Sequence, residues 1–257
     1  MKRKVLLFLV AILIASTTLF AQKASDFIKD AQQGNPKAQY SLGLCYLNGD
    51  GVEANLQEAV KWWKKAALQG MHQAQFNLGI AYEQGKGVTQ NDKEAVKWYT
   101  LAAKQGDAEA QTNLGNCYYD GVGVEQDYGE AVKWYIKAAN KGVIQAQYDL
   151  AYSYYNGLGV AQDYSQAVKW FTLAAKRGHA SAQYNLGLCY EKGQGVERNL
   201  KEAAKWYRSA ADKGNVDAQK KLHNKGSYIV MIIIVVVIVT IIAIVCRVIK
   251  KLKRSRK

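Results

Sequence analysis

The sequence repeats itself at a fixed interval of 36 residues, and this period constrains the fold more than any other feature. The segment GKGVTQNDKEAVKWY at residues 85–99 recurs in closely similar form at residues 121–135, 157–171 and 193–207, with a more divergent copy at 49–63. A constant period of roughly 20 to 50 residues is typical of a solenoid, in which each repeat packs mainly against its neighbours. The sequence therefore predicts a solenoid of five repeats.

The glycine-rich start of each copy superficially resembles a phosphate-binding loop. Such a loop follows a β-strand, occurs once per nucleotide and ends in lysine followed by serine or threonine. These glycines instead follow helical patterns, recur in all five copies and lack that ending. We therefore interpret the GxGV segment as a turn that reverses the chain between two helices.

Two helices are predicted in every repeat from the spacing of apolar residues. Apolar positions three and four residues apart fall on one face of a helix. The recurring positions combine alanine and glycine, which permit close approach of helices, with large aromatic residues. In the first repeat they are Ala38, Leu42, Gly43 and Tyr46 for the first helix and Ala59, Trp62, Ala66 and Ala67 for the second.

The boundaries of these helices are also marked in the sequence. Before each second helix stands Asn or Asp, followed three residues later by Glu or Gln, which resembles a capping box. Glycine stands at the end of each helix, where it can adopt the left-handed conformation that terminates a helix. In the first repeat these residues are Asn55, Glu58, Gly49 and Gly70.

The two ends of the chain differ from the repeats. Residues 1–21 carry three basic residues, then an apolar run and small residues, which predicts a signal peptide; an uncleaved N-terminal anchor is the alternative. Residues 228–246 contain no charge and are long enough to cross a membrane as a helix. Residues 247–257 carry seven basic and no acidic residues, so the positive-inside rule predicts a cytoplasmic tail. We expect a single-pass membrane protein with exoplasmic repeats, which are periplasmic if the chain is bacterial.

The segments between these ends complete the predicted domain organisation. Residues 22–36 are expected to form an N-terminal half-repeat cap, residues 37–214 the five repeats, and residues 215–227 a C-terminal half-repeat with a short linker. The formal net charge of +14 includes three charges from the signal peptide and seven from the tail, so only about +4 remains for the rest. The charge therefore gives no reason to expect nucleic-acid binding.

The cysteines recur at one position of alternate repeats. Cys45, Cys117 and Cys189 occupy this position, and stacked helix layers would separate their thiols by about 20 Å. A disulfide requires Cα atoms within roughly 7 Å of each other. We interpret the position as one where small residues pack.

The sequence contains no set of residues that suggests catalysis. His72, His179 and His223 stand in different repeats, and neither metal-ligand spacing nor a nucleophile motif accompanies them. We therefore expect no enzyme activity, metal or cofactor, and we assign the histidines to helix caps or the surface.

The motif A-x-A-Q-x-N-L-G-x-x-Y-x-x-G-x-G-V, followed by D-x-x-x-A-x-x-W-Y-x-x-A-A-x-x-G, resembles the Sel-one-like repeat (SLR), a relative of the tetratricopeptide repeat, over residues 25–224. The resemblance implies a right-handed α/α superhelical solenoid of 36-residue helix-turn-helix repeats, with the first helices lining a concave surface. It also implies an adaptor or scaffold role in protein complexes. A secreted, cysteine-rich branch of the family pairs the two helices of each repeat by a disulfide; this sequence departs from that pattern, so the hydrolase activity suggested for that branch is not expected.

The positions expected on the concave face vary between repeats while the core positions do not, as in a binding surface. The column containing Asn77, Asn113, Asp149 and Asn185 is the sharpest candidate, because the matching asparagine of tetratricopeptide clamps contacts peptides. The alternative is that these side chains bond only to the neighbouring repeat. The candidate partner-binding residues are Lys37, Gln73, Asn77, Glu109, Asn113, Asn116, Asp149, Tyr152 and Asn185.

The second helices carry one lysine at the same position of every repeat. We interpret this column as a solvated convex face; contact with an anionic ligand is the alternative. The lysines are Lys61, Lys97, Lys133, Lys169 and Lys205. The predicted function is a membrane-tethered interaction scaffold that binds a protein or peptide outside the cytoplasm, and the alternative is an envelope factor that binds glycan or another ligand.

Overall fold

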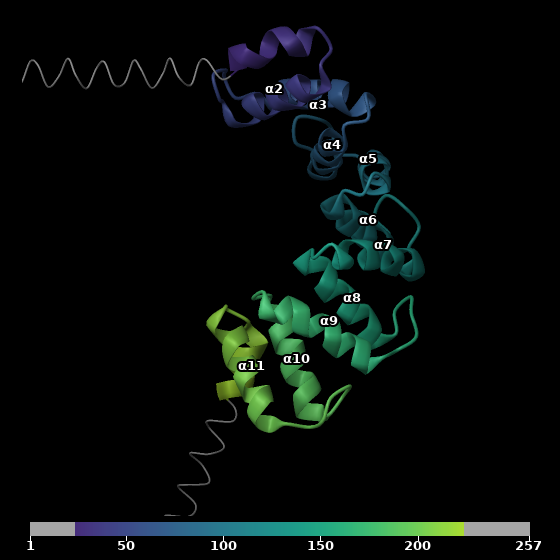
Figure 1. Cartoon of the computed structure of the whole chain (residues 1–257), viewed down its shortest axis with the longest axis vertical. Helices are drawn as coiled ribbons and strands as arrows, with labels where there is room; N and C mark the ends of the chain where they lie inside the picture. The colour runs from purple at the N-terminus through teal and green to yellow at the C-terminus, as the bar shows by residue number, and fades with distance from the viewer. Residues whose placement is uncertain (1–23, 224–257) are drawn as a thin grey trace, which may run out of the picture. The chain divides into compact units, whose positions relative to one another are not determined.

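The computed structural model describes residues 24–223, and this part of the chain is helical apart from its turns. The labelled helices (Figure 1) are α2 (Pro36–Asn48), α3 (Leu56–Leu68), α4 (His72–Gln84), α5 (Asp92–Lys104), α6 (Ala108–Asp120), α7 (Tyr128–Asn140), α8 (Ile144–Asn156), α9 (Tyr164–Lys176), α10 (Ala180–Lys192) and α11 (Leu200–Asp212). Helical segments also occupy residues 24–32 and 216–223. Since the described residues contain no strand, the predicted all-helical repeat fold is confirmed for them.

Three segments predicted from the sequence lie outside the described residues. They are the signal peptide at residues 1–21, the membrane helix at 228–246 and the basic tail at 247–257. None of the helices between residues 24 and 223 combines the length and the apolar character needed to span a bilayer.

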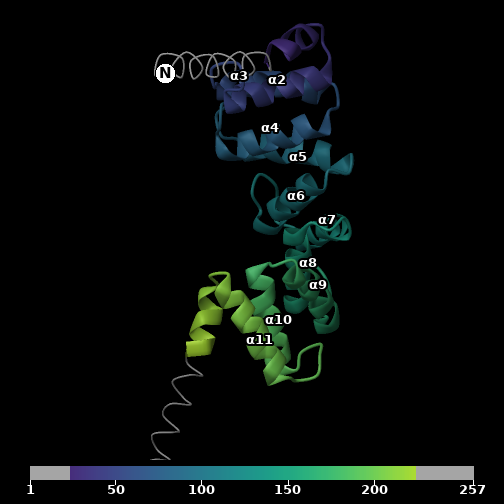
Figure 2. The same cartoon turned by 60° about the vertical axis from the view of Figure 1, so that its left-hand side comes forward.

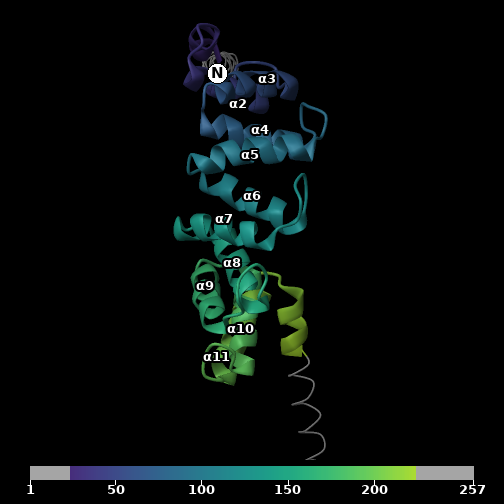
Figure 3. The ribbon, with the colours of Figure 1, turned by 90° about the vertical axis from the view of Figure 1, so that its right-hand side faces the viewer.

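The described chain divides into two compact units, which we call the N-terminal unit (residues up to 162) and the C-terminal unit (residues from 163). In the N-terminal unit, which contains α2 to α8, each helix from α2 to α7 packs against the next helix along the chain, as Figures 2 and 3 show for α2 to α5. In the C-terminal unit, α9 packs on α10 and α10 on α11. Each unit is therefore built from repeating helix pairs joined by contacts between sequence neighbours.

The core of the repeats consists mainly of the small and aromatic residues predicted from the sequence. Ala38, Leu42, Ala59 and Ala66 are buried, whereas Tyr46 is only half-buried. The glycines of the first helices lie directly against aromatic rings of the paired second helices. A Cβ atom on Gly79, for example, would lie 2.4 Å from the ring of Tyr99. The small residues thus allow the close helix approach that the sequence indicated.

The helix boundaries confirm one half of the predicted capping box and correct the other. Asn55 Oδ1 accepts a hydrogen bond from the backbone N–H of Glu58 at 3.1 Å, and the corresponding bond recurs in the other four repeats. The reciprocal bond from Glu58 was wrong, because the backbone N–H of Asn55 instead donates to the carbonyl of Tyr46 at 2.8 Å. The Glu58 carboxylate accepts from Lys61 Nζ at 2.9 Å. Gly49 adopts φ 79° at the end of α2, as predicted.

Two repeated contacts join each repeat to the one before it. A buried glutamine of the first helix donates to a carbonyl near the end of the preceding second helix, as Gln75 does to Ala67 at 3.1 Å. In four of the five GxGV turns, the second glycine lies against the first turn of the preceding second helix. A Cβ atom on Gly123 would lie 2.3 Å from the carbonyl oxygen of Asp92. The turn glycines therefore serve repeat packing, which accounts for their recurrence.

Cys45, Cys117 and Cys189 are buried, and no disulfide forms among the described residues. Burial raises the pKa of the Cys117 and Cys189 thiols to about 12. The interpretation of this column as a packing position is confirmed.

Candidate functional site

Two cavities occupy equivalent places in the N-terminal unit, two repeats apart. Each lies where consecutive first helices meet over the second helix between them. The first, here the apolar cavity, has a volume of about 230 Å³ and is lined by Leu47, Leu56, Val60, Trp63, Asn77, Ile80, Ala81, Gln84 and Lys86. The second, here the tyrosine cavity, has a volume of about 310 Å³ and is lined by Asn116, Tyr119, Asp120, Tyr135, Gln145, Tyr148, Asp149 and Tyr152.

Four positions of the repeat line both cavities, but with different side chains. Leu47, Trp63, Asn77 and Ile80 of the apolar cavity correspond to Tyr119, Tyr135, Asp149 and Tyr152 of the tyrosine cavity. The same place in the fold is therefore lined by different chemistry in different repeats.

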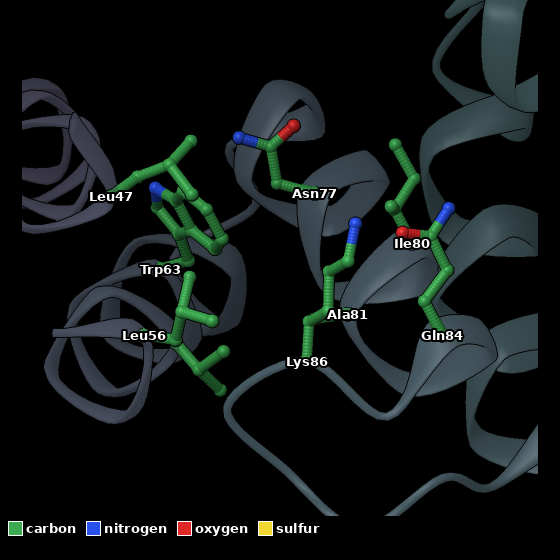
Figure 4. A pocket seen from close by; sticks show the side chains of 9 residues that line it. Leu47, Leu56, Trp63, Asn77, Ile80, Ala81, Gln84 and Lys86 are labelled. Atoms are coloured by element: carbon green, nitrogen blue, oxygen red, sulfur yellow. The ribbon is translucent and has the colours of Figure 1, made fainter.

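The apolar cavity presents hydrocarbon and one indole ring. Figure 4 shows Leu47, Leu56 and Trp63 on one side and Asn77 and Ile80 of α4 on the other. The indole N–H of Trp63 is buried and has no hydrogen-bond partner among the described residues. The turn after α4 places the positive charge of Lys86 at the cavity. The hydrocarbon groups and the indole ring of this lining suit an apolar side chain.

The tyrosine cavity combines aromatic rings with a carboxylate. The hydroxyl of Tyr135 donates to Asn116 Oδ1 at 2.8 Å, and Gln145 Nε2 donates to Asp149 Oδ1 at 2.9 Å. The other carboxylate oxygen, Asp149 Oδ2, is shielded from solvent and has no hydrogen-bond partner among the described residues. Burial raises the pKa of Asp149 to about 7. The hydrogen bond from Gln145 lowers this pKa, and the negative charge of Asp120 raises it further.

In the preceding repeat pair, hydrogen bonds engage the residues that correspond to Tyr119, Tyr135 and Asp149. The hydroxyl of Tyr99 donates to Glu83 Oε2 at 2.8 Å and also hydrogen bonds to Asn113. In the tyrosine cavity, Tyr119 stands where Glu83 stands, and Asp149 stands where Asn113 stands. The tyrosine hydroxyl therefore turns to Asn116, and the carboxylate of Asp149 is left without a tyrosine partner.

The structure gathers three of the predicted partner-binding residues in one cavity: Asn116, Asp149 and Tyr152. Asn77 lines the apolar cavity but also hydrogen bonds to Tyr40 of the preceding repeat. Together with the bond between Asn113 and Tyr99, this shows that both asparagines contact the neighbouring repeat. Partner binding by these side chains stays a prediction.

The remaining predicted residues do not join either cavity. Lys37, Gln73 and Glu109 lie in the first turns of α2, α4 and α6, and Asn185 is half-buried on α10 of the C-terminal unit. The two cavities therefore include only some of the predicted partner-binding residues.

Sequence reasoning did not select Tyr119, Tyr135 or Tyr148 of the tyrosine cavity as binding residues. One signal was available in the sequence. At the repeat position where Glu83 and Glu191 stand, the third repeat has Tyr119 instead, and this exchange changes the hydrogen bonding of the buried tyrosine opposite.

The lysine column of the second helices is largely paired with acids. Lys61, Lys97, Lys133 and Lys205 form ion pairs with the glutamates three residues earlier, at N–O distances of 2.5 to 3.4 Å. In the remaining repeat Gln166 replaces the glutamate, and Lys169 Nζ lies 5.6 Å from the ring centre of Trp170. This pairing supports the solvated-face interpretation.

Two of the histidines make local structural contacts. His179 Nδ1 accepts a hydrogen bond from the backbone N–H of Ala182 at 3.1 Å and so caps α10. His72 Nδ1 lies 2.9 Å from Asp107 Oδ2. No group of three potential metal-ligating side chains occurs in the described part of the chain.

The helix pairs, the contacts between successive repeats and the recurring cavities define a helical repeat protein. A family model for the Sel1 repeat matches residues 36–71, 72–107, 108–143, 144–179 and 180–215. The chain therefore belongs to the Sel1 repeat family, as the resemblance indicated.

Solved structures agree with this assignment. The structure of a Sel1 repeat protein from Oxalobacter formigenes is similar with a TM-score of 0.74 and 38% identity, over 82% of this chain and 87% of that chain. A protective antigen present in uropathogenic Escherichia coli strains, which displays an SLR fold, is similar with a TM-score of 0.50 and 38% identity, over 75% of this chain and 49% of that chain. No curated protein sequence matched the chain.

Proposed function

We propose that this chain is a non-enzymatic, membrane-tethered scaffold whose repeats hold a segment of a partner protein outside the cytoplasm. One observation carries the proposal: the same place between repeats forms an apolar cavity in one pair and a tyrosine cavity in another. Repeats of one backbone with different linings can each receive a different side chain of one ligand. Membership of a family of interaction repeats supports this function.

The spacing of the two cavities suits an extended polypeptide. Two repeats correspond to roughly 20 Å along stacked helices. An extended chain advances about 3.3 Å per residue, so side chains about six residues apart would reach both cavities. A short extended segment of the partner is therefore a sufficient ligand.

The membrane tether and the exoplasmic location rest on residues 1–21, 228–246 and 247–257. Their composition supports a signal peptide, a membrane helix and a cytoplasmic tail. Tethering would concentrate the bound partner at the membrane surface.

The scaffold function is tested by crosslinking the full chain in its native membrane and identifying attached proteins by mass spectrometry. Leu47 and Tyr152 each line one cavity and are 40% and 37% exposed, so glutamate at both positions should remove the crosslinked partner without unfolding the repeats. Ile136→Glu is the matched control, because Ile136 is 36% exposed on α7 and lines neither cavity. Equal capture by the double variant and the control would refute this binding surface.

A further inference from the structure

The tyrosine cavity has the size of a site for one side chain rather than for a large ligand. Its volume is about 310 Å³, and small-molecule sites begin at roughly 300 Å³. Four of its eight lining residues are tyrosines and two are aspartates, and no lysine, arginine or histidine lines it. The lining is therefore aromatic and acidic.

The carboxylate of Asp149 lacks a positive partner. Its Oδ1 atom accepts from the exposed Gln145 side chain, whereas Oδ2 has no partner among the described residues. A buried carboxylate is stabilised by a cation or by further hydrogen-bond donors. Asp120 lines the same cavity, so it adds a second acid where a positive group is missing.

The aromatic rings supply a second type of contact for a cation. The rings of Tyr148 and Tyr152 have centres 6.3 Å apart and are tilted by 38° to each other. The face of an aromatic ring attracts ammonium and guanidinium groups. Rings and carboxylate therefore favour the same kind of ligand group.

Three exchanges act together to create this environment. Compared with the preceding repeat, Tyr119 replaces Glu83, Asn116 replaces Ile80 and Asp149 replaces Asn113. With Tyr119 and Asn116 in place, the hydroxyl of Tyr135 donates to Asn116. Asp149 then places an acid at a position whose side chain does not hydrogen bond to that hydroxyl. The apolar cavity, in contrast, has Asn77 at the acid position and Lys86 in its lining.

We propose that the tyrosine cavity is a subsite for a lysine or arginine side chain of the bound polypeptide, with Asp149 as its counter-ion and Tyr148 and Tyr152 as its aromatic walls. That the cation belongs to a protein partner rests on the proposed scaffold function. The apolar cavity two repeats away then takes an apolar side chain of the same segment.

Binding of the cation is linked to the ionisation of Asp149. The pKa of Asp149 is about 7, so a bound cation that stabilises the carboxylate displaces its proton, and affinity rises as the pH increases through this value. The titratable groups that line the cavity with Asp149 come from α6, α7 and α8 and are Asp120, Tyr119, Tyr135, Tyr148 and Tyr152. Burial raises the pKa of Tyr119 and Tyr135, so these hydroxyls stay neutral.

The first test measures binding of labelled peptides to the detergent-solubilised full chain. The probes carry leucine and lysine six residues apart in a serine background, in both orders, and norleucine replaces lysine in the control peptides. At pH 8 we expect the lysine peptide to bind about tenfold more tightly than the norleucine peptide, as one charge-assisted contact provides. In Asp149→Asn this preference should fall below about twofold. Asparagine occupies the equivalent position of three other repeats, so the variant should retain the fold.

The second test does not depend on peptide binding. n-Butylammonium should raise the Tm of the wild-type chain at pH 8 but not that of Asp149→Asn, and n-butanol should show no such difference. Equal binding of lysine and norleucine peptides would overturn the cation subsite and leave the scaffold in place. Absence of all peptide binding, together with selective stabilisation by butylammonium, would overturn the scaffold and leave the subsite. Failure of both discriminations would overturn the proposal.

Discussion

The surroundings of Asp149 disfavour the ionised form of its carboxyl group. The two asparagines of its column in the N-terminal unit, Asn77 and Asn113, hydrogen bond to tyrosines of the preceding repeat. Asp149 replaces that neutral contact with a carboxylate whose buried Oδ2 atom has no hydrogen-bond partner among the described residues. Ligand-free repeats should therefore be less stable with aspartate than with asparagine wherever the carboxylate is ionised.

This effect depends on pH in a defined direction. The pKa of Asp149 is about 7 in the folded chain, against about 3.9 for an unfolded aspartate. Between these values the folded state keeps a proton that the unfolded state releases, so stability falls as the pH rises. We expect Asp149→Asn to stabilise the ligand-free chain by about 1 to 4 kcal/mol at pH 8 and by little at pH 4.

Urea unfolding of the wild type and of Asp149→Asn at both pH values provides the measurement. Asn113→Asp is an informative companion, because it introduces an acid beside the Tyr99 hydroxyl that Asn113 contacts. A gain from Asp149→Asn that is the same at pH 4 and pH 8 would show that burial does not hinder ionisation of Asp149.

The helices of each pair are held at a distance set by a glycine opposite an aromatic ring. Gly79 faces Tyr99, and Gly115 faces Tyr135 in the next repeat. Tyr99 is fully buried, so the ring has no free space into which it could move. Glycine stands in these first helices despite its low helix propensity, because a larger residue would push the two helices of the repeat apart.

The substitution Gly79→Ala tests this explanation. Alanine favours a helix by about 1 kcal/mol over glycine, yet its Cβ would lie 2.4 Å from the Tyr99 ring. We expect the variant to be destabilised by about 1 to 3 kcal/mol, as overpacked cores are. Thermal unfolding monitored by circular dichroism gives the measurement.

Gly129→Ala is the control for this prediction. Gly129 lies on α7, where an added Cβ would lie 3.2 Å from the Asp127 carboxylate and would contact no ring. The control should be close to neutral or slightly stabilising. If both variants changed stability alike, contact with the Tyr99 ring would not be the reason for glycine at position 79.

The elements were largely predictable from the sequence because their determinants are local and repeated. The period, the apolar stripes, Asn55 as a cap and Gly49 as a terminator all follow from residues near one another in the chain. The reciprocal bond of the capping box was not predictable, since the N–H it needed is taken by Tyr46 of the other helix. The tyrosine cavity likewise depends on Tyr119, Tyr135 and Asp149, which come from three helices.

At the scale of the whole molecule, the proposed location of the repeats rests on sequence outside the described residues. Residues 228–246 predict a membrane helix and residues 247–257 a cytoplasmic tail. We expect the full chain to resist alkaline extraction from membranes, whereas a chain ending at residue 227 should be released. Protease added to intact cells with a permeable outer layer should digest the repeats and spare a tag placed after Lys257. Release of the full chain by alkali would contradict the tether.

The turn glycines carry a consequence for how such a gene changes over generations. Gly87 is fitted to the backbone of Leu56, and Gly123 to that of Asp92, in the same way at each junction. Recombination that adds or removes DNA for one whole repeat joins surfaces that already match. An insertion of another length shifts the 36-residue register, so that a residue larger than glycine stands at the junction. The length of the array can therefore vary in whole repeats, while under the proposed function single substitutions in the cavities would change which side chains are accepted.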